Sequence, residues 1–275
     1  MNENVRVRPG RGLAGMIGAY NGFRYADLDP GHHAGLPSGN LTFIISLADP
    51  IDIVAMPGRQ DPARSEAFVG GLHLRPAWMA HDGHGAGIGI EVSPLASRAI
   101  FGMPAAELSS QIIDLTDLLG AEARRLLGML AETTSWPERF ALVDGVLASL
   151  RRDASSPAPE MVMAWTALSE AGGNLPIARL AEKVGYSRRH LSKCFSAEFG
   201  MSPKEAARIL RFERTCGLLD VGLSLSEAAV TGGYYDQAHL TNEWRELAGQ
   251  SPVSWQADEL RDRSSPHDGG EVKVG

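Results

Sequence analysis

The sequence predicts an α+β protein with a β-rich amino-terminal domain, trailing helices and an all-helical carboxyl-terminal domain. Three observations support this prediction. Short runs rich in Ile, Val, Phe and Leu, separated by Gly, Pro, Asp and Asn, fill residues 16–93. Apolar residues recur at helical spacing through residues 94–152. After residue 161, a pattern of helix, glycine turn and helix occurs twice.

Residues 16–93 contain five candidate strands, over residues 18–24, 41–46, 51–57, 67–74 and 88–92. Regular short strands bounded by turn residues are typical of a small sandwich or barrel. A small-molecule pocket in such a domain would need inward-pointing apolar and aromatic side chains. Five aromatic residues are candidates for that pocket and equally for plain core: Phe23, Tyr25, Phe43, Phe68 and Trp78.

Residues 94–152 predict amphipathic helices. One apolar face combines Ala123, Leu126, Leu127 and Leu130, and another combines Phe140, Val143, Val146, Leu147 and Leu150. Apolar faces of this kind need a partner to cover them. We expect them to pair two copies of the chain in a homodimer, and the alternative is that they cover the β-rich domain.

The first helix-turn-helix unit lies between residues 177 and 203. Its first helix has one apolar face, which includes Leu180 and Ala181, and ends at Gly185, since glycine takes a positive φ without strain. Ser187 is placed to cap the second helix through its hydroxyl. The buried face of that helix is predicted to consist of Leu191, Phe195 and Phe199.

The opposite face of this second helix is polar and basic. It carries Arg188, Arg189, His190, Ser192, Lys193 and Ser196. Side chains of these types contact phosphates and guanine edges in DNA complexes. One such unit alone fits DNA binding and a solvated helical hairpin about equally well.

The repeat favours DNA binding. Ala181 and Gly185 recur 48 positions later as Ala229 and Gly233. The following apolar and turn residues recur 49 positions later, as Leu240, Trp244, Gly249 and Pro252. One helix from Pro203 to about Leu219 is predicted to join the two units, with a length of about 25 Å. Two recognition helices on such a rod could enter successive major grooves, about 34 Å apart.

This arrangement resembles the AraC/XylS family of bacterial transcription regulators. The resemblance covers residues 161–255 and is carried by L-A-x-x-V-G-Y-S-x-x-x-L-x-x-x-F in the first unit and G-Y-x-D-Q-x-H-L in the second. It implies that the amino-terminal domain is a cupin-like β-barrel that serves as a sensor. It also implies double-stranded DNA as a partner, with a small-molecule effector and RNA polymerase as further candidates.

The resemblance also implies which residues contact DNA. In the first unit they are Arg189, Ser192 and Lys193, with Arg188 and His190 nearby. In the second unit the matching positions are Gln237, His239, Thr241 and Asn242. The second unit departs from the family pattern, because Asn242 stands where the family usually has Arg. Thr215, in the joining helix, stands where the family usually has Ala.

Charge differs between the two units. Residues 177–215 hold nine Lys or Arg against four Asp or Glu, whereas residues 216–250 hold one against five. Because basic groups near phosphates supply the salt-dependent affinity for DNA, we expect the first unit to dominate that affinity.

A metal site of the cupin enzyme type would need two histidines one residue apart on a strand, followed by a glutamate and a later histidine. The histidines of the β-rich region are His32, His33, His73, His81 and His84. Their spacing does not match, so we expect no metal and no cofactor, and we place these histidines on the surface or in loops.

The composition limits the remaining options. The chain has 275 residues and a net charge of −7, which fits a basic patch attached to an acidic regulatory domain. The two cysteines, Cys194 and Cys216, imply no disulfide framework, so we expect a reducing, cytoplasmic environment. No signal peptide or membrane-spanning run is visible, and we expect no membrane partner.

We therefore predict four segments: a sensor and dimerisation domain at 1–152 (barrel at 16–93, helices at 94–152), a linker at 153–160, a DNA-binding domain at 161–260 and a disordered tail at 261–275.

The predicted function is that of a transcription regulator that is not an enzyme. A repair methyltransferase sharing this carboxyl-terminal fold would need several cysteines before Cys194, and the chain has none there. The histidine and glutamate spacing of a cupin metal site is absent, which disfavours a cupin-type metalloenzyme fused to the DNA-binding domain. A ligand-independent dimeric regulator stays open.

Overall fold

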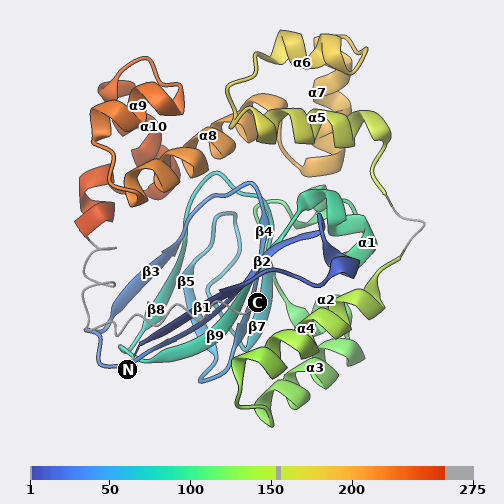
Figure 1. Ribbon diagram of the computed structural model, residues 1–275, viewed down its shortest axis with the longest axis vertical. Coiled ribbons are helices and arrows are strands. Elements are labelled where there is room, and N and C mark those ends of the chain that lie inside the picture. The colour runs from blue at the N-terminus through green and yellow to red at the C-terminus, as the bar shows by residue number, and fades with distance from the viewer. Residues whose placement is uncertain (1, 153–155, 258–275) are drawn as a thin grey trace.

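The computed structural model describes residues 2–152 and 156–257, with a β-rich half and a helical half (Figure 1). The predicted α+β class is confirmed. Part of the predicted linker, at 153–155, and the predicted tail at 261–275 lie outside the described residues.

The strands of the described residues form two antiparallel sheets. The larger sheet has the order β1-β2-β9-β4-β7-β10, and the smaller has the order β3-β8-β5-β6. The bounds are β1 Glu3–Val7, β2 Ile17–Tyr25, β3 Gly31–Gly35, β4 Leu41–Ser46, β5 Ile51–Ala55, β6 Ala63–Ser65, β7 Ala67–Gly70, β8 Ala77–His81, β9 Gly85–Val92 and β10 Ile112–Asp114.

The two sheets pack as a sandwich, whereas the cupin-like expectation was a closed barrel. A closed barrel needs an unbroken ladder of hydrogen bonds around all the strands. Here the chain leaves the smaller sheet at the end of β6 and enters the larger at the start of β7, with only Glu66 between them. The consecutive strands β6 and β7 therefore belong to different sheets, and the ladder of hydrogen bonds is interrupted between them.

Alternate residues of the larger sheet face two different cores. Phe68 on β7 packs with Ile53, Ala77 and Ile112 between the sheets. Phe43 on β4 faces the other side, where it belongs to the core that the helices cover. This separation follows from the two-residue period of side chains along a strand.

Helices and short 3₁₀ turns cover the outer face of the larger sheet. They are η1 Arg11–Leu13, η2 Pro94–Ala96, α1 Ser97–Phe101, η3 Ala105–Leu108, α2 Leu115–Leu119, α3 Ala121–Ala131 and α4 Trp136–Leu150. Tyr20 on β2 stacks on Phe140 of α4 with ring centroids 6.1 Å apart. Gly22 on β2 leaves room for Trp136, because a Cβ there would lie 2.5 Å from the Trp136 ring.

The apolar faces of α3 and α4 are therefore used inside the chain. Leu126, Leu130, Val143 and Leu147 are at most 1% exposed. Large exposed apolar side chains of the described residues lie elsewhere: Val54, Met163, Val221, Val230, Tyr235 and Val253. These faces are not free to pair two subunits, because they are already covered within the chain. The homodimer stays a prediction, but these faces no longer support it.

The helical half consists of α5 Pro159–Glu170, α6 Ile177–Lys183, α7 Arg188–Phe199, α8 Pro203–Asp220, α9 Leu225–Gly232 and α10 Gln237–Ala248. Helix α8 joins α6 and α7 at one end to α9 and α10 at the other (Figure 1). Its 18 residues span about 27 Å. No helix of the described residues is both long and apolar enough to cross a membrane.

The first part of α8 packs in one core and the second part in another. Ile209 and Leu210 belong to a core that continues through α7 into the β-rich half. Phe212 and Leu219 belong to a separate core with α9 and α10. Thr215, the departure from the family pattern, is fully buried, and its hydroxyl donates to the Arg211 carbonyl at 2.8 Å. Gly232 of α9 leaves space for it, since a Cβ there would lie 2.5 Å from the Thr215 hydroxyl.

Polar contacts also join the two halves. Arg98 of α1 donates to Glu198 of α7 through a forked ion pair with N–O distances of 2.9–3.2 Å. The backbone N–H of Gly39 donates to the Glu213 carboxylate of α8 at 3.0 Å. Burial raises the pKa of Glu213. The β-rich half thus contacts both the first recognition helix and the joining helix.

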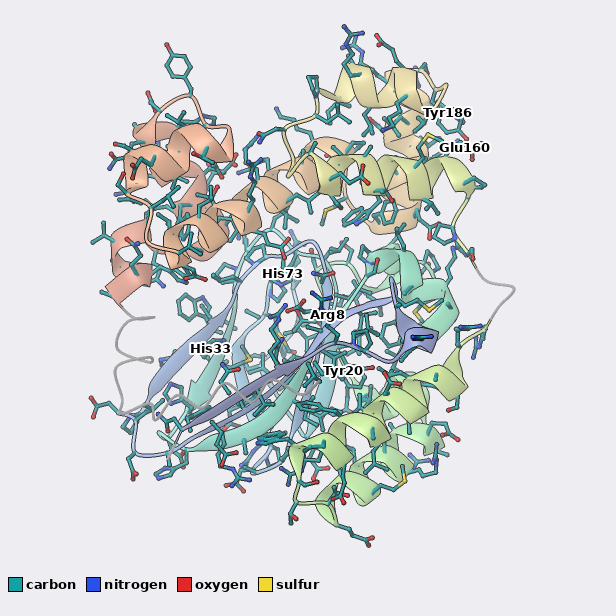
Figure 2. All side chains as sticks on the ribbon, viewed as in Figure 1. Arg8, Tyr20, His33, His73, Glu160 and Tyr186 are labelled. Atoms are coloured by element: carbon teal, nitrogen blue, oxygen red, sulfur yellow. The ribbon has the colours of Figure 1, made fainter. Side chains whose placement is uncertain are left out.

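The histidines of the β-rich half occupy different environments. His32, His33 and His84 are exposed, whereas His73 is only 8% exposed. His73 lies in the loop between β7 and β8, at the end of the sheets that faces the helical half (Figure 2). Its Nδ1–H donates to the Arg75 carbonyl at 2.6 Å. The described residues contain no cluster of three or more groups suited to a metal ion.

Burial lowers the pKa of His73 from its ordinary value of 6.5. The unfolded chain protonates this ring below pH 6.5 while the folded chain resists protonation, so stability should fall as the pH drops below 6.5. We expect His73→Asn to flatten this decline in urea-unfolding measurements between pH 7.5 and 5.5. His84→Asn, at an exposed position, should leave the decline as in wild type. An unchanged decline in His73→Asn would contradict the assignment.

Candidate nucleic-acid interface

The first unit consists of α6, a glycine turn and α7. Gly185 follows the end of α6 with φ +72°, as the sequence predicts. The Ser187 hydroxyl caps α7 by accepting the His190 backbone N–H at 3.2 Å. These two features fix where α7 begins and in which direction it leaves α6.

An aromatic cluster holds α7 on α5. The Trp165 ring lies 4.6 Å from the Phe199 ring, and the Phe195 and Phe199 rings lie 4.5 Å apart. Leu191, Phe195 and Phe199 are fully buried. The predicted apolar face of α7 is therefore turned inward, which leaves its basic face in solvent.

Three cations of α7 are available to a ligand. Arg188, Arg189 and Lys193 are exposed, and within the described residues none of them has an ion-pair partner. Ser192 is half-buried. His190 is exposed but engaged, because its ring meets Tyr186 edge-on at 4.4 Å and its Nε2 lies 3.6 Å from the Cys194 sulfur. Its ring is therefore less available to a ligand than the three cations.

The second unit has the same construction with α9 and α10. Gly233 ends α9 with φ +89°, and Asp236 caps α10 by accepting the His239 backbone N–H at 2.7 Å. Leu240 and Trp244 are fully buried, and the Trp244 ring contacts Phe212 of α8 with centroids 4.7 Å apart.

The predicted contacts of α10 are more engaged than those of α7. The Gln237 side chain accepts from the Ser226 hydroxyl at 3.1 Å. His239 Nδ1 accepts the Tyr235 backbone N–H at 3.3 Å. The Thr241 hydroxyl donates to the Gln237 carbonyl at 2.8 Å. Asn242 is exposed and lines a cleft between the units.

Tyr235 is a residue that the sequence reasoning did not single out. The offset between the two units grows from 48 to 49 positions after the turn tyrosine, which makes Tyr235 the inserted residue beside the cap of α10. Its side chain is 92% exposed. The change in offset could have identified this exposed side chain from the sequence. A residue inserted in a tight turn must point its side chain away from the packed helices.

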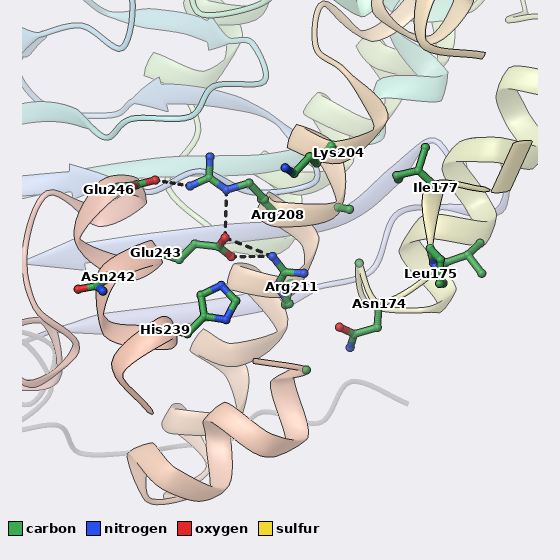
Figure 3. Close-up of a pocket in the computed structure, with 14 residues that line it drawn as sticks. Asn174, Leu175, Ile177, Lys204, Arg208, Arg211, His239, Asn242, Glu243 and Glu246 are labelled. Carbon is green, nitrogen blue, oxygen red and sulfur yellow. Dashed lines mark hydrogen bonds and ion pairs between the residues drawn. The ribbon is translucent and has the colours of Figure 1, made fainter. Parts of the chain in front are cut away.

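A polar cleft of about 620 Å³ separates the units (Figure 3). Lys204 and Ile177 line it from the first unit, and His239 and Asn242 line it from the second. Arg208 and Arg211 of α8 form ion pairs with Glu243 across it. Two of the nine basic residues counted for the first unit are thus neutralised by the second, which reduces the charge contrast that the sequence suggested.

The five aromatic residues proposed for a ligand pocket do not form one site. Phe23 and Tyr25 stack on each other at 6.2 Å, and Tyr25 meets His81 of the smaller sheet at 5.8 Å. These two and Phe68 therefore face the space between the sheets. Phe43 is in the opposite core, and Trp78 lies beside Gly249 of the second helix-turn-helix unit.

Known proteins share both the motif and the arrangement of the halves. A family described as a helix-turn-helix domain matches residues 180–258, and one described as a domain of unknown function matches residues 5–114. An uncharacterized HTH-type transcriptional regulator, YbfI of Bacillus subtilis, is 29% identical over 85 residues. That match spans 30% of this chain and only 31% of YbfI.

The carboxyl-terminal half of the chain thus contains a helix-turn-helix domain, and the chain resembles transcription regulators of the AraC type. Two crystal structures of ToxT from Vibrio cholerae share the fold of this chain. One, from strain O395, has a TM-score of 0.52 and 12% identity, covering 86% of this chain and 95% of ToxT. The other, with an unsaturated fatty acid bound, has a TM-score of 0.55 and 10% identity, covering 90% and 96%.

The turn glycines of the two units should differ in their tolerance of a side chain. Gly185→Ala meets no atom within 4 Å, so it should cost only the left-handed backbone strain, about 1–2 kcal/mol. Gly233→Ala would place a Cβ 2.0 Å from Asn174 Oδ1 and should cost about 1–3 kcal/mol more. Urea unfolding of both variants measures this difference.

Asn174→Ala in the Gly233→Ala background provides the control. It removes the obstructing amide and should recover the additional cost, leaving only the backbone strain. Equal losses for the two glycine variants would show that Asn174 does not pack against this turn as described.

Proposed function

We propose that this AraC-type regulator binds a double-stranded DNA site by placing α7 and α10 in successive major grooves. One observation carries the proposal: both recognition helices are fixed by their apolar faces to a single continuous helix and turn polar faces to solvent. The length of α8, about 27 Å, is close to the roughly 34 Å between successive major grooves on one face of the duplex.

In this proposal α7 supplies most of the affinity. Arg189 forks onto a guanine edge, which is worth about 1–3 kcal/mol of discrimination between bases. Arg188 and Lys193 bind phosphates and position the helix without reading sequence. Helix α10 contains one cation, Arg245, against two acids, so Gln237, His239, Thr241 and Asn242 contribute mainly selectivity. Exposed Tyr235 is a further contact next to that helix.

We also propose that a small apolar acid modulates DNA binding through the β-rich half. The fold likeness to ToxT with an unsaturated fatty acid bound supports this class of ligand. Phe23, Tyr25 and Phe68 face the space between the sheets and would line its site. A homodimer and a contact with RNA polymerase stay predictions of the family resemblance.

Loss of two cations from α7 should reduce affinity more than loss of two polar residues from α10. We expect Arg189→Ala with Lys193→Ala to weaken binding through the lost guanine contact and to lower the slope of log K against log salt by about 1, since the one phosphate contact of Lys193 contributes about 0.9. Gln237→Ala with Asn242→Ala should leave the slope near wild type. Fluorescence anisotropy on duplexes selected from a random pool measures both effects.

Arg124→Ala with Arg125→Ala, on α3 of the β-rich half, controls for the loss of two positive charges. That pair should change neither slope nor affinity appreciably. The proposal fails if the Gln237 and Asn242 pair causes the larger loss, or if the wild type binds DNA weakly and without dependence on salt in the full chain and in residues 155–260 alone.

An unsaturated fatty acid should raise the thermal unfolding midpoint of the wild type, because a ligand that binds only the folded state stabilises it. Phe23→Ala should abolish the rise by removing a ring from between the sheets. Trp78→Ala, also half-buried but outside that space, should retain it. If the wild type shows no rise with any acid tested, the ligand-independent regulator becomes the better description.

A further inference from the structure

A charged cluster crosses the cleft between the two units (Figure 3). Glu243 of α10 accepts from Arg208 Nε at 3.0 Å. Its two oxygens also accept from Arg211 Nη2, at 3.0 and 3.2 Å. Arg208 extends the cluster to Glu246, one turn further along α10. The cluster therefore joins two turns of α8 to α10.

The centre of this cluster is withdrawn from water. The Glu243 side chain is 8% exposed, and those of Arg211 and Arg208 are 18% and 25% exposed. A buried charge is costly unless it is paired, and removal of one partner leaves an uncompensated charge. The ion pairs therefore penalise any position of α10 in which Glu243 moves away from the two arginines.

The other contacts between α8 and the second unit are mainly apolar. Phe212, Leu219, Leu240 and Trp244 share one core. Apolar attraction is non-directional, whereas hydrogen-bonded ion pairs between guanidinium groups and a carboxylate fix both distance and orientation. On the opposite wall of the cleft, Asn174 donates to the Gly232 carbonyl at 3.2 Å and ties the first unit to α9. The cluster is thus the most directional contact that sets the angle of α10 on α8.

The angle of α10 on α8 has a consequence for DNA. The first recognition helix is fixed at the other end of α8, so a rotation of α10 changes the distance and phase between the two recognition helices. One base pair advances the duplex by about 3.4 Å and about 34°. Small rotations of α10 would therefore suit different separations of the two parts of a DNA site.

We propose that Glu243, held by Arg208 and Arg211, is a positioning residue that sets the spacing between the two half-sites this regulator accepts. The inference rests on the proposed function, in which both units contact DNA together. It assigns Glu243 no contact with DNA, in contrast to its neighbour Asn242.

The test compares spacing preference, a quantity that simple destabilisation would not change. Sites are first selected from random duplexes with the wild-type full chain. Affinity is then measured for the selected site, for versions with one, two or three base pairs inserted between the halves, and for the first half alone. We expect the wild type to bind the selected spacing at least about tenfold more tightly than the inserted versions.

Glu243→Gln keeps the volume of the side chain and removes its charge. We expect it to bind the first half alone as wild type does, and to lose most of the roughly tenfold preference for the selected spacing. Glu246→Gln is the matched control, with the same change on the same helix at a side chain that is 68% exposed. It should keep the wild-type preference, because exposed ion pairs contribute little.

Two outcomes separate the inference from the function on which it rests. If folded Glu243→Gln keeps the full spacing preference, the positioning role is wrong and DNA binding by two units stands. If the wild type binds the first half alone as tightly as any two-part site, the two-unit function fails and the inference fails with it. If circular dichroism shows that Glu243→Gln does not fold, Arg208→Lys is tested in its place. It retains the positive charge but cannot contact Glu243 and Glu246 through two separate nitrogens.

Discussion

The division of α8 between two hydrophobic cores is the constraint on which the rest of the helical half depends. Side chains up to Leu210 pack with the first unit, and side chains from Phe212 onward pack with the second. The residue between them is Arg211, which forms an ion pair with Glu243 and lies over the Tyr234 ring at 5.1 Å. A helix shared in this way joins the two units while each keeps its own core.

The same helix and its neighbour α7 also meet the β-rich half. The first core runs without interruption from the sheets through η3 and α7 to Leu210. The Arg98–Glu198 fork and the contact of Gly39 with Glu213 add direction to this apolar surface. The raised pKa of Glu213 reflects a carboxylate that has exchanged water for a single backbone donor. A rearrangement of the sheets would therefore act on the helical half through its contacts with the end of α7 and with α8.

Sequence patterns located the helical elements well because their signals are local. The serine and aspartate caps, the glycine turns and the apolar spacing each act within four residues, so the starts of α7 and α8 follow from Ser187 and Ser202. Patterns were less informative for the sheets. The candidate strand at 67–74 contains both β7 and the loop with buried His73, because apolar residues alone do not distinguish a paired strand from a packed loop.

By itself, the sequence determined the α+β class, the two helix-turn-helix units, the joining helix and the resemblance to the AraC/XylS family. These features depend on residue types at short, fixed spacings. Only the tertiary structure decided that α3 and α4 cover a sheet, that Phe43 and Phe68 face different cores, and that Glu243 pairs with arginines 32 and 35 positions earlier. Those outcomes depend on which surfaces meet after the chain has folded. The partner of a buried charge is the opposite charge that lies nearest in the folded structure, whatever its separation along the sequence.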